Sequence, residues 1–235
     1  MPSARRPLTF ADLYREPFRL FFPAATLAGL LGVLLWVPLL LGWTTDYPGT
    51  AHARLMVQGF FGGFMFGFLG TSMPRLLEVP PFAAREVFPL LALFAVQAGA
   101  HLLGAVAVGD GLFVMELVLW LTLLKGRCHT KRGLPPPTFV LVGLAFGCGL
   151  AGTALFLAGR RWELSPELEL LARLLSYHAF VLLCVLGAGG FLLPRFLGLG
   201  VRRKLPASAT VTPEWRAAAG FAGTTGLLLV ITYGL

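Results

Sequence analysis

Charged residues are scarce in this sequence, and their scarcity excludes an ordinary soluble domain. Asp, Glu, Lys and Arg make up 13% of the 235 residues, whereas soluble domains carry about 25%. Hydrophobic residues reach 57% and the mean hydropathy is +0.78. We therefore predict an all-α, polytopic transmembrane helix bundle in contact with the lipid bilayer.

Cysteine pairs and catalytic motifs are also missing. Three cysteines, Cys128 in a basic loop and Cys148 and Cys184 inside apolar segments, give no disulfide framework. No Cys-x-x-Cys or Cys-x-x-Cys-His motif is present, which excludes covalent c-type haem attachment. The sequence contains no P-loop, no dinucleotide fingerprint, no HExxH motif and no nucleophile–base pair. A catalytic role is therefore the weakest of the functional classes.

Basic residues outnumber acidic ones, but they do not form a nucleic-acid-binding face. The net charge is +8, and the basic residues lie between apolar runs. With the N-terminus inside and seven crossings, the outer segments hold four basic residues, Arg54, Arg160, Arg161 and Arg173, which leaves 15 of the 19 inside. This asymmetry predicts a cytoplasmic N-terminus in the inner (cytoplasmic) membrane, with no nucleic-acid partner.

Long apolar runs divide the chain into a cytoplasmic lead-in, residues 1–19, and a transmembrane helical domain, residues 20–235. The predicted spans cover residues 20–42, 52–75, 87–108, 112–124, 138–158, 174–193 and 217–235. The fourth run has only 13 residues, fewer than the ~17 that a span needs, so whether it crosses fully is open. Gly109-Asp110-Gly111, just before it, is predicted to be a tight turn.

The second span carries a stripe of small residues. Gly59, Gly63 and Gly67 are four residues apart and share one helix face, which lets another helix approach closely in lipid. That neighbour is either a helix of the same bundle or a partner. The chain stops inside an apolar run, so the partner could be a separate subunit or a missing C-terminal half.

Polar residues of the spans gather at one depth, in the outer half of the bilayer. At a rise of ~1.5 Å per residue, His52 lies about 34 Å from Arg75 at the inner interface, and His101 and His178 also fall in the outer half. Imidazoles facing one another across a bundle suit haem iron, copper or zinc. Further candidates for lining a ligand pocket are Arg54, Met56, Gln58, Gln97, Glu116 and Tyr177.

Each of these residues also has a purely structural interpretation. A lone histidine often bonds a backbone carbonyl, and Glu116 either pairs with Arg54 or is a protonated carboxyl that donates to a neighbour. The shared depth of several polar groups favours a site over separate structural roles.

The segment HARLMVQGF, followed by GFLGT and a Pro-Arg pair, resembles the NnrS family of bacterial membrane proteins. That family is described as haem- and copper-containing and is associated with nitric oxide stress and denitrification. The segments REPFRLFFPAA and LGAGGFLLPRFLG are similar to its N-terminal element and its sixth helix. His52 matches the first histidine of the family motif and Met56 its methionine, whereas Arg54 and Leu55 replace the second histidine and the glutamate.

Two functions follow from these patterns. The first is an NnrS-like membrane protein that binds haem or copper and takes part in a response to nitric oxide or a related nitrogen oxide. The alternative is a transporter-like or scaffold subunit without a cofactor, whose glycine stripe packs against a separate partner.

Overall fold

A computed structural model of the protein describes residues 9–199 and 210–233, and every regular element in these ranges is helical. The elements are α1 (Phe10–Arg15), α2 (Phe18–Leu34), α3 (Trp36–Leu40), α4 (Gly49–Arg54), η1 (Leu55–Phe61), α5 (Gly62–Leu77), α6 (Ala84–Leu102), α7 (Val106–Cys128), α8 (Phe139–Ala158), α9 (Pro166–Arg173), η2 (Leu174–Ala179), α10 (Phe180–Phe196) and α11 (Pro213–Ile231). The predicted all-α fold is confirmed.

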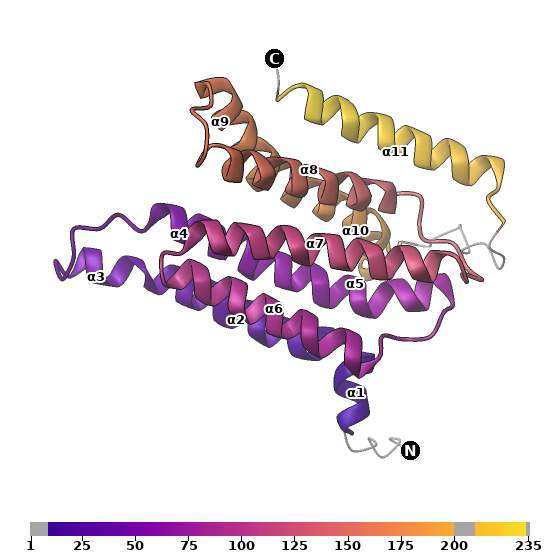
Figure 1. Cartoon of the computed structure of the whole chain (residues 1–235). Coiled ribbons are helices and arrows are strands. Elements are labelled where there is room, and N and C mark those ends of the chain that lie inside the picture. The colour runs from indigo at the N-terminus through magenta and orange to yellow at the C-terminus, as the bar shows by residue number, and fades with distance from the viewer. Residues whose placement is uncertain (1–8, 200–209, 234–235) are drawn as a thin grey trace.

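Several of these elements join into longer helices. The π-helical segment η1 connects α4 to α5, and the π-helical segment η2 connects α9 to α10. Within the described ranges, five helices are long and apolar enough to cross a membrane: 18–40, 49–77, 106–128, 139–158 and 166–196. The chain is a multi-pass membrane protein. Helices α6 and α11, of 19 residues each, run alongside these five (Figure 1).

The bundle is built around α7 and α8, which contact each other. Helix α6 packs on α7, and α2 packs on η1 and α5. On the other side, α10 and η2 pack on α8, and α11 lies against the outer side of α8 (Figure 1). The loops before α4, between α6 and α7, and between α8 and α9 lie at one end of the bundle, which we call the α4 end (Figure 1). Which end faces the cytoplasm stays a prediction.

The predicted turn at Gly109-Asp110-Gly111 is wrong. These residues lie inside α7, and the chain reverses earlier, at residues 103–105, where Gly104 has a φ of +75°. Helix α7 therefore has 23 residues and is long enough to span. Asp110 is tolerated in an apolar helix because its carboxylate is paired with a buried arginine, as described below.

The glycine stripe of the second span lies against α2 of the same chain. A Cβ atom added to Gly63 would lie 2.7 Å from the Cβ atom of Ala25, and one added to Gly67 would lie 3.0 Å from the Cα atom of Phe18. The small residues thus permit the close helix approach that lipid-embedded packing requires. Helix α2 occupies this groove, so of the two predicted neighbours it is a helix of the same bundle.

Candidate functional site

Polar side chains from four elements meet inside the bundle near the α4 end. Arg54 ends α4, Gln58 lies in η1, Gln97 and His101 lie in α6, and Asp110 lies in α7. None is more than 3% exposed. Buried polar groups in a bilayer must satisfy one another, because no water or lipid headgroup is available there. We call these five residues the buried network.

The charge of the buried network is balanced by one ion pair. The Nε atom of Arg54 lies 2.6 Å from Oδ1 of Asp110, and Nη2 lies 3.1 Å from Oδ2. Two parallel N–H···O bonds of this kind are the strongest geometry that an arginine and a carboxylate can adopt. Neither charge is isolated in the low-dielectric interior, which is the condition for burying such a pair.

Gln58 links the ion pair to α6. Its Nε2 atom donates to Asp110 Oδ1 at 2.8 Å, and its Oε1 atom accepts a hydrogen bond from Gln97 at 3.2 Å. Nε2 of His101 lies 2.8 Å from the same Oε1. An amide oxygen only accepts hydrogen bonds, so the proton of the neutral His101 ring is assigned to Nε2. The other ring nitrogen, Nδ1, is then an acceptor, and it has no hydrogen-bond partner among the described residues.

Arg54 is also fixed on the side facing α8 and η2. Its Nη1 atom donates to the hydroxyl of Tyr177, and its Cζ atom lies 3.7 Å from the ring centroid of Phe156. A guanidinium held by a carboxylate, a phenol and an aromatic face has little rotational freedom. Gln58 and Tyr177 both lie in π-helical segments, which occur frequently at functional sites.

Glu116 stands apart from this network. It is fully buried in α7, and neither carboxyl oxygen has a hydrogen-bond partner within the described ranges. The predicted pairing of Glu116 with Arg54 is wrong, because Arg54 pairs with Asp110 instead. Sequence reasoning missed Asp110 since it assigned the residue to a turn. Asp110 could have been predicted from Arg54, because an arginine within a span needs a carboxylate at its own depth.

The three histidines proposed as ligands have different surroundings. His101 belongs to the buried network, and its ring packs so tightly on α7 that a Cβ atom on Gly109 would overlap it. His178 is exposed on η2. Across residues 9–199 and 210–233, no three His, Cys, Asp or Glu side chains are grouped to hold a metal ion. A single site that uses all three histidines therefore does not fit this arrangement.

His52 alone has the geometry of a prepared ligand. Its Nδ1 atom lies 3.0 Å from the carbonyl oxygen of Gly32 in α2, and its ring packs edge-on against Trp36. The carbonyl accepts, so Nδ1 carries the proton and Nε2 holds the free lone pair. Met56, four residues later, also reaches Gly32, where an added Cβ atom would lie 3.6 Å from its sulfur. Both residues are half-buried.

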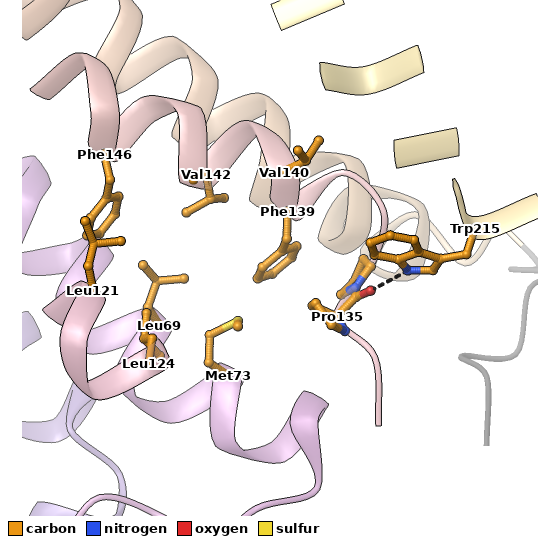
Figure 2. A pocket seen from close by; sticks show the side chains of 12 residues that line it. Leu69, Met73, Leu121, Leu124, Pro135, Phe139, Val140, Val142, Phe146 and Trp215 are labelled. Carbon is orange, nitrogen blue, oxygen red and sulfur yellow. Dashed lines mark hydrogen bonds between the residues drawn. The ribbon is translucent and has the colours of Figure 1, made fainter. Parts of the chain in front are cut away.

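An apolar cavity lies towards the end of the bundle opposite the α4 end. Its volume is about 290 Å³, and apolar side chains of α5, α7 and α8 surround it (Figure 2). Trp215 of α11 borders it and donates from Nε1 to the carbonyl oxygen of Pro135 at 2.9 Å (Figure 2). None of the predicted site residues lines this cavity.

Together, the spans and the buried network define a multi-pass helical membrane protein with a charged centre inside the bundle. The sequence matches the family model described as NnrS protein over residues 12–234. The chain therefore belongs to the NnrS family. No curated protein and no solved structure matches it.

Proposed function

We propose that this protein acts in the bacterial cytoplasmic membrane in a response to nitric oxide or a related nitrogen oxide, and that it holds copper or haem through His52. Membership of the NnrS family supports the process. The observation that carries the metal role is the contact between His52 Nδ1 and the Gly32 carbonyl. A bound copper or haem iron would supply a redox-active centre able to take up a small nitrogen oxide.

The residues around His52 fit such a role. A hydrogen bond from Nδ1 to a backbone carbonyl fixes the tautomer and the ring orientation of metal-binding histidines, and it directs Nε2 towards the metal. The thioether of Met56 is a soft ligand that favours Cu(I). Trp36 covers one side of the imidazole and limits its rotation. His101 and His178 remain predicted ligands, but among the described residues neither has a ring nitrogen bonded to a backbone carbonyl.

Metal analysis and oxidised and reduced absorption spectra of the detergent-purified protein test the proposal. We expect near-stoichiometric copper or iron, loss of the metal in His52→Ala, and a weaker loss of copper alone in Met56→Leu. His129→Ala is the matched control, because His129 lies directly after α7 at the opposite end of the bundle. A metal content unchanged by His52→Ala would refute the assignment.

A second candidate function, a transporter-like subunit without a cofactor, is favoured by the buried Arg54–Asp110 pair. Charged residues inside membrane spans usually line substrate or ion pathways. A featureless spectrum without iron or copper, combined with loss of function in the folded double variant Arg54→Met/Asp110→Leu, would favour this alternative.

A further inference from the structure

A small polar pocket opens at the α4 end, where α8 gives way to α9. Its volume is about 180 Å³. Arg54 and Phe156 lie on the side facing the bundle, and the exposed residues Arg160, Glu169 and Arg173 form its outer wall. We propose that this pocket binds a small, planar, monovalent oxyanion.

The first argument concerns the distribution of arginines. The loops and helix ends at the α4 end carry four basic residues, Arg54, Arg160, Arg161 and Arg173, and three of these line this one pocket. Membrane proteins avoid basic residues in outer segments, and the predicted orientation makes the α4 end the outer one. The arginines that break the pattern therefore gather around one cavity, as a binding site for an anion requires.

The second argument is the unused donor capacity of Arg54. A guanidinium has five N–H groups. In Arg54, Nε and Nη2 each donate one hydrogen bond to Asp110, and Nη1 donates one to Tyr177. One N–H on each terminal nitrogen is left without a partner among the described residues. These two N–H groups are charged donors that an oxyanion in the pocket could accept hydrogen bonds from.

The charges around the pocket select for a single negative charge. Three arginines line it with one carboxylate, Glu169, whose Oε2 lies 3.5 Å from Nη2 of Arg173. Asp110 is paired with Arg54 and neutralises the charge of that arginine. One positive charge is therefore unbalanced, and a divalent anion would meet repulsion from both carboxylates. The apolar side chains of Leu155 and Leu164 on the pocket wall also disfavour a strongly hydrated divalent ion.

Thermal unfolding of the purified full chain tests the proposal. Sodium nitrate and sodium formate are titrated separately at constant ionic strength maintained with sodium chloride, whose spherical anion offers no pair of oxygens. A ligand that binds the folded state raises the unfolding midpoint in a saturable way. We expect this rise with nitrate and formate. We expect Arg160→Gln and Arg173→Gln each to raise the apparent dissociation constant roughly tenfold, since each removes a charged donor.

Arg161→Gln is the matched control. It removes the same charge from the neighbouring residue, which does not line the pocket, so its nitrate response should equal that of the wild type. If Arg160→Gln and Arg161→Gln weakened nitrate binding equally, the effect would be general charge attraction, and the proposal would be overturned. The absence of a saturable response to nitrate and formate, or a saturable response to sulfate with a lower apparent dissociation constant, would also overturn it. Because Arg160→Gln leaves His52 intact, its metal content should not change, which separates this test from that of the proposed function.

Discussion

The guanidinium of Arg54 and the carboxylate of Asp110 face each other inside the bundle, joined by two hydrogen bonds, although 56 residues separate them in the chain. Their side chains are 4% and 0% exposed. The pair fixes the end of α4 against the first turns of α7, and it sets Gln58 where that amide can reach α6. The orientation of the buried network therefore depends on this one contact.

Asp110→Asn should destabilise the protein strongly. It leaves the Arg54 guanidinium buried without a counter-charge, which costs about 3–5 kcal/mol. Replacing both partners in Arg54→Met/Asp110→Leu should be less harmful than the single change, because no isolated charge remains. Thermal or denaturant unfolding in detergent measures the difference. Asp46→Asn, at an exposed position at the same end, is the control. A single variant as stable as the wild type would contradict the proposed importance of the pair.

Gly109→Ala should displace the His101 ring, whereas Gly111→Ala in the same helix should not. A Cβ atom at position 109 would overlap the imidazole, and one at position 111 meets nothing within 4 Å. Overpacking of this kind costs about 1–3 kcal/mol, while an unhindered Gly→Ala change in a helix gains up to about 1 kcal/mol. Unfolding midpoints that move in opposite directions, with altered ¹⁵N shifts of His101 only in Gly109→Ala, would agree with the structure. Identical shifts in both variants would count against it.

The fold class could be predicted from composition, whereas parts of the network could not. The scarcity of charge and the long apolar runs are sufficient to indicate a helical membrane bundle. Depth along the helices was enough to select Gln58, Gln97 and His101, because rise per residue converts position into height. Asp110 was missed because a Gly-Asp-Gly sequence favours a turn in water. In the bundle, an arginine 56 residues away stabilises it within a helix.

Depth also could not say which polar residues face one another around the helix axes. His52, His101 and His178 are all predicted in the outer half of the bilayer, yet they lie in different surroundings: one against α2, one within the network and one exposed. The π-helical turns η1 and η2 change the rotational position of the residues that follow them, and no simple sequence pattern marks such turns.

Gly63→Ala should separate α2 from the helix formed by η1 and α5. The added Cβ atom would lie 2.7 Å from Ala25 and 2.9 Å from the Phe94 ring. Helix association in lipid relies on such close packing, so we expect destabilisation by roughly 1–3 kcal/mol. Gly99→Ala in α6 is the control, since nothing lies within 4 Å of its added Cβ atom. Comparable stability of both variants would show that α2 is not seated in the glycine groove.

Acid should weaken the opposite end of the bundle through Glu86. Burial alone would raise the pKa of this carboxyl, but hydrogen bonds from Arg127 and the Ala83 N–H, with the charges of Arg127 and Arg85, outweigh burial and lower it below its usual value of 4.5. A pKa that is lower in the folded state means that folding favours the ionised form. The resulting stability is present above pH 4.5 and is lost as the pH falls through the folded-state pKa.

Unfolding midpoints measured between pH 7 and pH 3 check this linkage. Glu86→Gln should be less stable than the wild type at neutral pH and should lose less stability on acidification. Glu163→Gln, at an exposed position at the α4 end, should keep the wild-type dependence. If Glu86→Gln showed the full wild-type loss, the ion pair with Arg127, whose Nη2 lies 2.7 Å from Oε2, would not contribute to acid sensitivity.

Glu116→Met should stabilise the fold and impair the function. The Glu116 carboxyl is fully buried, and neither of its oxygens has a partner in the described ranges. An unsatisfied buried polar group costs about 1–3 kcal/mol, which a methionine of similar volume would remove. Retaining such a group in the bilayer is typical of residues that act on a substrate, ion or proton. A higher unfolding midpoint together with a weaker form of the proposed nitrogen-oxide response would assign Glu116 a functional role, whereas a lower midpoint would show that the carboxyl is satisfied within the folded membrane protein.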